Sequence, residues 1–163
     1  MRIYKAVEPF TKEEAEVAFA QGTSEQINDA LLGVTYYVEN WRWVQSACLT
    51  LLDSSDTQVQ GMALTCLGHL ATFHRTLDLD IVLPALQAHA SDPQLASSLY
   101  DAFGDISSKI IRNTPSLVKD WDELPQGLKE ALIEDELFDS RGKRIRRFFG
   151  RTMKHKAVEP HAK

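Results

Sequence analysis

Long hydrophobic runs are missing from this sequence. No stretch approaches the roughly 18 consecutive apolar residues that a membrane-spanning helix needs. The first ten residues, MRIYKAVEPF, hold no uninterrupted apolar segment, and charged residues follow directly at Lys12, Glu13 and Glu14. We therefore expect no secretory signal and a cytoplasmic protein.

Cysteine is scarce, because Cys48 and Cys66 are the only two. Both fall on apolar stripes of expected helices, where a thiol serves as a small core side chain. A disulfide framework of the kind that stabilises small secreted domains is not expected. This cysteine usage is typical of a reducing compartment.

Sequence motifs of the common enzyme classes are also absent. The chain contains no glycine-rich phosphate loop, no serine-centred elbow and no His-Glu-x-x-His element. Cys66, His69 and His74 have a spacing that can hold a metal, but no further cysteine pair or carboxylate cluster completes tetrahedral coordination. A Cys66–His69 nucleophile and base would lack oxyanion donors on a regular helix. We expect no enzymatic activity, no cofactor and no metal site.

A strong charge asymmetry is present. Residues 141–163 carry nine Lys/Arg and one acidic residue, whereas the 140 residues before them carry nine Lys/Arg and 22 Asp/Glu. The net charges are therefore +8 and −13. An acidic body repels nucleic acid and attracts basic proteins, whereas the tail taken alone favours an anionic partner.

The stretch from Trp41 to His74 predicts an antiparallel helical hairpin. Two segments place apolar residues at the i, i+3, i+4, i+7 spacing of a buried helical stripe, and the Asp-Ser-Ser-Asp sequence at 53–56 supplies turn and N-cap chemistry between them. Gly61 and Gly68 would let another helix approach closely, at a cost in helix propensity. The stripe residues are Val44, Ala47, Cys48, Leu51 and Leu52 in the first helix, and Val59, Met62, Ala63, Cys66, Leu67, Leu70 and Phe73 in the second.

Helix-start signals precede this hairpin. Thr11 stands three residues before Glu14, and Thr23 three residues before Gln26, which is the spacing of a capping box. These signals predict two short helices, the first of which ends near Gly22.

Further helix signals follow the hairpin. A helix from Leu79 to about Ala90 contains Pro84, so we expect it to kink there or to begin only near Val82. Asp92 followed by Pro93 predicts the start of the next helix, with Pro93 in its first turn.

The second helix of the hairpin is repeated after 36 residues. Self-similarity at a period of 20–50 residues indicates a stack of units that bury their faces against one another. The positions Asp56, Val59, Ala63, Leu67, Gly68 and Leu70 correspond to Asp92, Leu95, Leu99, Phe103, Gly104 and Ile106.

The repeated pattern resembles the second helix of a HEAT-type repeat. In that family, paired antiparallel helices stack into a curved solenoid whose second helices line the concave face. The resemblance covers residues 24–108 and implies an all-α fold, a short HEAT-like α-solenoid of antiparallel helical hairpins with a C-terminal helical extension. Gln60 and Ala96 replace the basic residue often found after the branched apolar position, so the stabilising side-chain ladders of that family are not implied.

A narrower resemblance is carried by WRWVQ at 41–45, TCLGH at 65–69 and the helix at 79–86. These segments are similar to small single-domain bacterial HEAT-like proteins. Some of those proteins are immunity partners of polymorphic or contact-dependent toxins.

Three regions follow from these patterns. Residues 1–111 form the HEAT-like helical-repeat domain, residues 112–140 a helical extension and residues 141–163 a basic tail. Within the extension, we expect a short helix at 116–122 and a second helix at 125–138. The tail, which includes Phe148 and Phe149, could dock on the acidic body, contact RNA or contact an anionic membrane.

The candidate partner-binding residues lie off the apolar stripes. The 36-residue offset places Asp101 beside Thr65 and Asp105 beside His69, and Tyr36 and Tyr37 would extend this surface onto the preceding helix. Trp41 and Trp43 diverge by about 200° on a helix, so one of them is exposed beside Arg42 as a binding hot spot, or both seal the edge of the core. The full candidate set is Tyr36, Tyr37, Trp41, Arg42, Trp43, Thr65, His69, Asp101 and Asp105.

These features favour a protein-binding module. The leading hypothesis is an immunity protein that neutralises a bacterial toxin by covering its basic active-site cleft, with nucleic acid as an unfavoured partner. One alternative is a HEAT-like adaptor or oligomerising scaffold without a toxin partner. The other is an RNA-associated protein that acts through its basic tail.

Overall fold

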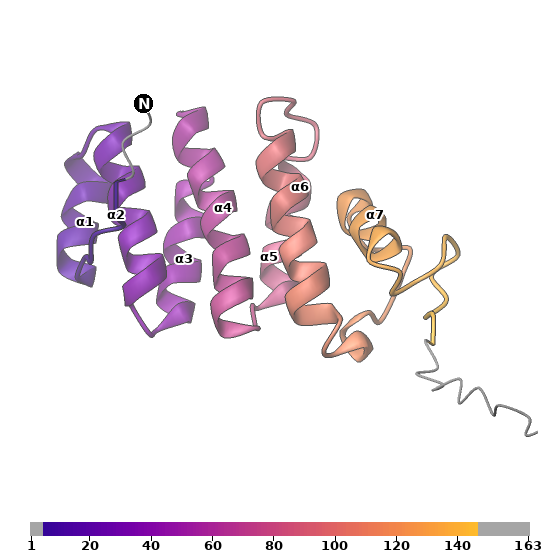
Figure 1. The fold of residues 1–163 in the computed structure, drawn as a ribbon. Coiled ribbons are helices and arrows are strands. Elements are labelled where there is room, and N and C mark those ends of the chain that lie inside the picture. The colour runs from indigo at the N-terminus through magenta and orange to yellow at the C-terminus, as the bar shows by residue number, and fades with distance from the viewer. Residues whose placement is uncertain (1–4, 147–163) are drawn as a thin grey trace, which may run out of the picture.

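The structure, a computed structural model, describes residues 5–146, which fold into helices (Figure 1). An isolated bridge between Phe138 and Arg144 is the one β-type pairing within that range. The predicted all-α class is confirmed. The α-helices are α1 (Lys12–Gln21), α2 (Ser24–Tyr37), α3 (Trp41–Leu51), α4 (Thr57–His74), α5 (Leu79–Ala88), α6 (Ala96–Asp105) and α7 (Gln126–Glu134), with a π-helix η1 (Ile106–Ile111) and a 3-10 helix η2 (Pro115–Leu117).

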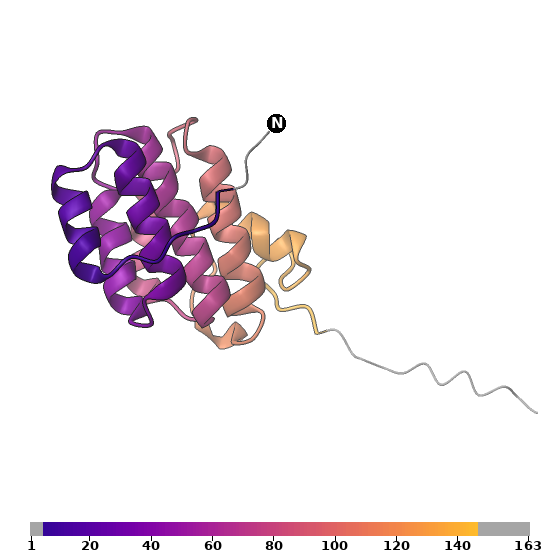
Figure 2. The same ribbon diagram turned by 60° about the vertical axis from the view of Figure 1, so that its left-hand side comes forward.

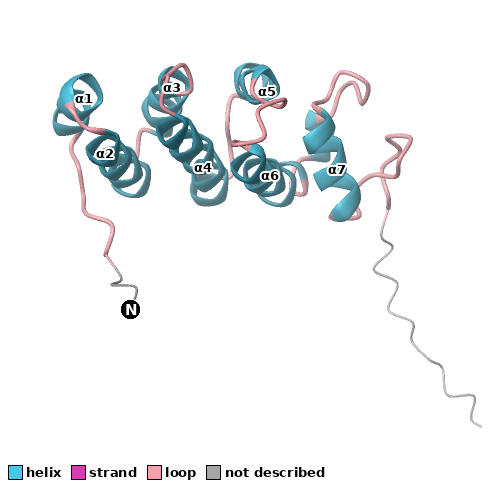
Figure 3. Ribbon diagram, turned by 90° about the horizontal axis from the view of Figure 1, so that it is seen from above, coloured by secondary structure: helices cyan, strands magenta, loops and turns pink. Residues whose placement is uncertain are grey.

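The first six helices form two layers. Seen from above, α1, α3 and α5 lie in one layer and α2, α4 and α6 in the other, while α7 follows at the C-terminal end (Figure 3). Helix α4 is central, because it packs against α2, α3 and α6. The close approach of α6 depends on Gly68 of α4, because a Cβ there would lie 2.6 Å from Oδ2 of Asp105. A Cβ at Gly61 would lie 3.5 Å from Oγ of Ser98, which is an ordinary contact distance.

Side-chain caps fix where the first helices begin. The Thr11 hydroxyl accepts from the Glu14 N–H at 3.1 Å, and the Glu14 carboxylate accepts from the Thr11 N–H at 2.9 Å. Thr23 and Gln26 form the same reciprocal pair. Both predicted capping boxes are therefore confirmed, and each satisfies two backbone donors that a helix start leaves free.

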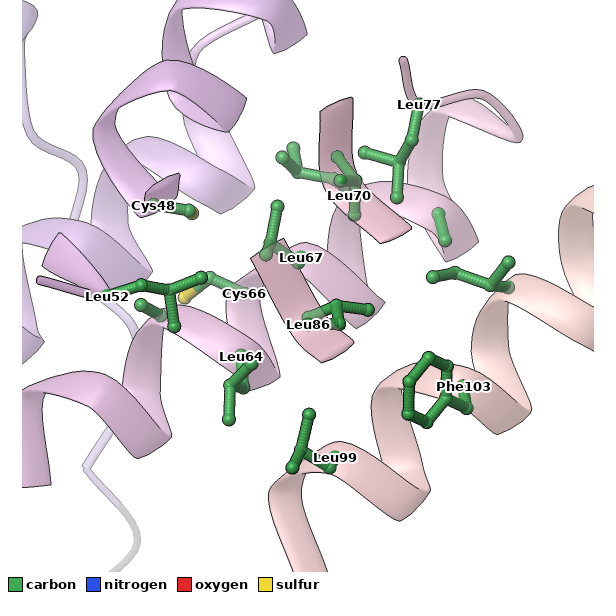
Figure 4. Packing of buried hydrophobic residues seen from close by; sticks show 14 of the residues in the cluster. Cys48, Leu52, Leu64, Cys66, Leu67, Leu70, Leu77, Leu86, Leu99 and Phe103 are labelled. Atoms are coloured by element: carbon green, nitrogen blue, oxygen red, sulfur yellow. The ribbon is translucent and has the colours of Figure 1, made fainter. Parts of the chain in front are cut away.

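Leucines of α4 form the middle of the core. In Figure 4, Leu64 and Leu67 point toward α5 and α6, where Leu86, Leu99 and Phe103 meet them. Leu64, Leu67 and Leu86 are fully buried. The cysteines Cys48 and Cys66 are free and buried among these side chains, as their positions on the apolar stripes predicted.

One residue of the predicted buried stripe is at the surface. Phe73 was expected in the core, but its side chain is 46% exposed. It lies in the last turn of α4, where its ring packs on Tyr36 and His69 instead of the core.

The starts of α5 and α6 differ from prediction. A start of α5 near Val82 is wrong, because the N–H groups of Ile81 and Val82 both donate to the Asp78 carbonyl and α5 begins at Leu79. The start of α6 at Pro93 is also wrong. The Asp92 carboxylate accepts from the Gln94 N–H at 2.9 Å and closes a tight turn, and the α-helix begins only at Ala96.

The C-terminal extension is less helical than its sequence predicted. The expected helix at 116–122 is a single 3-10 turn, Pro115–Leu117. The expected helix at 125–138 ends at Glu134, because Glu136 takes a left-handed conformation with φ 55°.

The described part of the basic tail folds back locally. Gly142, with φ 78°, lies against the Trp121 ring, which stacks on Phe138 at 5.6 Å between centroids. The contacts of residues 141–146 are therefore with the extension. The expected docking of Phe148 and Phe149 concerns residues outside the described range.

A segment before α1 covers the other end of the stack. Figure 2 shows this indigo stretch crossing the outer side of the first helix pair. Gly33 on α2 makes room for it, since a Cβ there would lie 2.5 Å from the ring of Phe10 and 2.6 Å from the carbonyl oxygen of Glu8.

Candidate functional site

A groove of about 380 Å³ lies between α4, α6 and α7. It brings together four of the predicted binding residues from two helices, and the 36-residue offset correctly placed them side by side. The groove is lined by Thr65, His69, Tyr100, Asp101, Ala102, Gly104, Asp105, Ala131, Glu134 and Asp135.

Two glycines at equivalent repeat positions shape this groove. Gly68 is buried and lets the Asp105 carboxylate sit against the α4 backbone, in space that a Cβ would occupy. A Cβ added at Gly104 would have no atom within 4 Å, apart from its chain neighbours and the nearby backbone of its own helix. The hollow therefore exists because α6 carries no side chain at this point.

Burial and neighbouring charges both shift the pKa values of Asp105 and His69 in the groove. Burial raises the pKa of Asp105, and the nearby carboxylate of Asp101 adds to this rise, while His69, Lys109 and a hydrogen bond with Thr72 act against it. Burial lowers the pKa of His69, and the Asp105 carboxylate partly offsets this. The imidazole is therefore mainly neutral near pH 7 and leaves the negative charge of the groove in place.

Helix α7 supplies the far wall. The Tyr100 hydroxyl donates to Oε2 of Glu134 at 3.0 Å, and this bond to a carboxylate raises the pKa of the tyrosine. The Ser107 hydroxyl donates to Oδ2 of Asp135 at 2.6 Å, and Arg112 lies 3.7 Å from the same carboxylate. Glu134 and Asp135 were not predicted as part of the site, because α7 and its C-terminal end lie outside the sequence repeat.

An aromatic cluster adjoins the groove. The Tyr36 ring meets His69 edge-on at 5.6 Å and Phe73 at 4.9 Å, and the His69 and Phe73 centroids are 5.9 Å apart. Tyr36 is 46% exposed, as is Phe73. His69 belongs to both features, so the aromatic cluster and the acidic groove form one continuous surface across α2, α4 and α6.

The remaining predicted residues lie elsewhere. The Tyr37 hydroxyl donates to the Val7 carbonyl at 3.1 Å and holds the segment before α1. The Arg42 guanidinium lies 4.3 Å from the Trp41 ring centroid, at the start of α3 in the other layer. Both Trp41 and Trp43 pack partly buried against the core, as in the alternative in which they seal its edge. A role of these residues in partner binding stays a prediction.

This chain is similar to a chain in a solved structure. That chain belongs to the crystal structure of a CDI complex from Cupriavidus taiwanensis LMG 19424, with 27% sequence identity and a TM-score of 0.60. The match covers 65% of this chain and 96% of that chain. The likeness therefore spans nearly all of a smaller protein that was crystallised in a complex. No protein-family model and no curated protein matches the sequence.

The structure places Cys66 in the core, apart from the carboxylates that line the groove. Within residues 5–146, no group of three or more His, Cys, Asp or Glu side chains is arranged to hold a metal ion. Cys66 lies in the core beside Cys48, whose thiol pKa is raised by burial, and is therefore not exposed beside His69. No helix among the described residues is both long and apolar enough to cross a membrane. What the site offers is carboxylates, a neutral imidazole and exposed aromatic rings.

Proposed function

We propose that this chain is a cytoplasmic immunity protein of a contact-dependent inhibition (CDI) system, which binds a toxin domain and blocks its active site. The observation that carries the proposal is the similarity, at 27% identity, to a chain of a CDI complex, 96% of whose length is matched. The chain itself performs no catalysis in this proposal. Its two-layer stack serves as a HEAT-like scaffold that presents a binding face.

The binding face is the layer formed by α2, α4 and α6. It carries the aromatic cluster of Tyr36, His69 and Phe73 and the carboxylates of the groove. Exposed aromatic rings beside charged groups have the composition of interface hot spots. The 22 acidic residues that precede residue 141 would accelerate encounter with a basic toxin surface.

The mechanism is steric and electrostatic. Nucleases and related toxins that act on nucleic acid need a positively charged cleft to hold phosphates. An acidic face that occupies such a cleft would exclude the substrate and neutralise the charge that attracts it. Affinity at such interfaces concentrates in a few central residues, so we expect substitutions in the middle of the face to weaken binding most.

The test is a binding measurement with the toxin domain encoded beside this chain in its genome. We expect tight binding by isothermal titration calorimetry and rescue of growth when the two are co-expressed. The double charge reversal Asp101→Lys/Asp105→Lys should weaken binding by at least about 100-fold, because it places two cations opposite a basic surface. Equal affinity of wild type and variant would exclude this face.

The matched control reverses two charges away from the face. Glu16 on α1 and Asp53 in the α3–α4 turn are exposed. The Glu16→Lys/Asp53→Lys variant has the same net charge as the groove variant but should keep near wild-type affinity. Removal of residues 147–163 should also leave toxin binding nearly intact, whereas loss of binding on that truncation would favour recognition through the basic tail.

A further inference from the structure

We propose that the surface formed by the α4–α6 groove and the aromatic cluster is a receptor for one arginine side chain of the partner. This inference rests on the proposed function, because it names the chemistry of the toxin residue that the immunity protein would hold. The stem of the arginine would lie on the rings of Tyr36 and Phe73, and its guanidinium would enter the groove beside Asp101 and Asp105.

The first support is negative charge that no ion pair among the described residues neutralises. Asp101 and Asp105 are four residues apart on α6, a spacing at which like charges on a helix repel. Within residues 5–146, neither carboxylate has a Lys or Arg within ion-pair distance, whereas Asp135 in the same groove is paired with Arg112. The free protein thus keeps a repulsive pair that a cation would relieve.

The second support is the neutral state of His69. Its Nδ1 atom is buried and has no hydrogen-bond partner in the part of the chain that the structure describes. An imidazolium at this position would neutralise Asp105 from within the protein and repel an incoming cation. A neutral imidazole leaves the carboxylate available and contributes an aromatic surface at the entrance to the groove.

The third support is the shape of the lining. The absence of a side chain at Gly104 leaves open space beside Asp105. Tyr36 and Phe73, from two different helices, stand exposed where His69 joins the cluster to the groove. A planar guanidinium suits this combination, because it binds carboxylates through two parallel hydrogen bonds and also stacks on aromatic faces.

The inference is tested first without the toxin. Methylguanidinium chloride is titrated into the full, ¹⁵N-labelled chain and followed by amide chemical shifts, with tetramethylammonium chloride at equal concentration as the control cation. We expect saturable shifts at positions 65, 69, 101 and 105 with methylguanidinium only. Shifts that do not saturate, or that are equally large near Glu16 and Asp53, would overturn the inference.

Two variants separate charge from shape. Asp101→Asn/Asp105→Asn keeps the volume of both side chains and removes the charges, whereas Gly104→Leu keeps the charges and fills open space. Each should weaken methylguanidinium binding by about fivefold or more, since a charge-assisted contact is lost in one and access in the other. Wild-type binding by both variants would contradict the proposal. Far-ultraviolet circular dichroism establishes that each variant is folded.

Binding of the toxin domain then separates a failure of the proposed function from a failure of the arginine-receptor proposal. If it does not bind the wild-type chain, the proposed function fails, whatever the methylguanidinium result. If it binds the wild type but also binds both variants within about twofold, only the arginine receptor is overturned. The expected result is a loss of at least about tenfold for both variants, with Glu16→Gln/Asp53→Asn unchanged.

Discussion

The two helices that share the 36-residue repeat, α4 and α6, lie in different surroundings. Helix α4 is covered on both flanks of its layer, by α2 and α6, and its Gly68 is buried against Asp105. Helix α6 has α4 on one side and the shorter α7 on the other, and its equivalent Gly104 faces open space. The same sequence pattern thus makes a packing contact in one helix and a groove in the next.

The equivalent residues Asp56 and Asp92, at the starts of these two helices, also have different roles. Asp56 caps α4 directly, since its carboxylate accepts from the Gln58 N–H at 2.8 Å and also from the hydroxyl of Ser24 on α2. Asp92 makes the equivalent backbone contact with Gln94, but it closes a turn that precedes α6. The pattern sets the register of side chains, and the neighbouring elements decide what each side chain does.

The largest expected effect concerns core positions, where the two helices should behave alike. Leu67 and Phe103 are equivalent and both buried. Leu67→Ala should lower the free energy of unfolding by roughly 2–5 kcal/mol and Phe103→Ala by roughly 3–5 kcal/mol, since each leaves a cavity. Urea denaturation measures both. Ser97→Ala, at an exposed position of α6, is the control and should change stability by less than about 0.5 kcal/mol. A cost below about 1 kcal/mol for Phe103→Ala would mean that α6 is loosely packed.

The equivalent glycines should respond in opposite directions. Gly104→Ala should raise the free energy of unfolding by about 0.5–1 kcal/mol, because alanine favours the helix and its Cβ meets nothing. Gly68→Ala should lower it by about 1 kcal/mol, since the Asp105 carboxylate must move and this overpacking outweighs the gain in propensity. Thermal and urea unfolding of the two single variants measure the difference. Stabilisation by both substitutions would show that α4 and α6 are less closely apposed.

The two equivalent capping residues, Asp56 and Asp92, should also contribute unequally to stability, with a smaller difference than the two glycines show. Asp56→Ala should lower the melting temperature more than Asp92→Ala, because only Asp56 caps an α-helix directly and bonds a second helix. Hydrogen bonds from Ser24 and the Gln58 N–H hold the pKa of Asp56 below its usual value. The stabilisation that the Asp56 carboxylate gives the folded state is therefore complete above pH about 4 and is lost as the pH falls through the lowered pKa. The difference in melting temperature between wild type and Asp56→Ala should shrink at acidic pH. A difference that is independent of pH would contradict this account.

The smallest effect is the titration of His69, which occupies the position in α4 that Asp105 occupies in α6. Burial lowers the pKa of His69, so its NMR titration midpoint should lie below about 6.5. Because the folded state disfavours the imidazolium, this residue costs stability as the pH falls below about 6.5. Asp105→Asn should lower the midpoint further, since the carboxylate stabilises the imidazolium. A midpoint at or above the ordinary value would show that His69 is solvated.

Much of the fold and part of the site could be predicted from the sequence. The capping boxes at Thr11 and Thr23 and the apolar spacing in α3 and α4 are local signals that packing did not override. The 36-residue offset also placed Asp105 beside His69, because a repeat relates neighbouring helices without further information. The HEAT-like assignment and the binding roles of the candidate residues stay predictions.

Features that depend on contacts outside the repeat could not be predicted. Phe73 has the spacing of a core residue, but it lies in the last turn of α4, where its ring packs on Tyr36. Glu134 and Asp135 enter the groove because α7 packs against α6, and no periodicity indicates that placement. The later start of α6 reflects a turn at Asp92 that competes with the helix for the same capping residue.

The covered ends of the stack have a consequence for stoichiometry. The segment before α1 closes one end, and α7 closes the other. The face between them is three helices wide, roughly 28 Å at ordinary helix spacing, and α4 extends along it for about 27 Å. Such a face offers roughly 750 Å², close to the roughly 800 Å² that each partner contributes to a standard protein complex. Under the proposed function, one toxin domain would fill this face, so each chain would neutralise a single toxin molecule and protection would require at least equimolar expression.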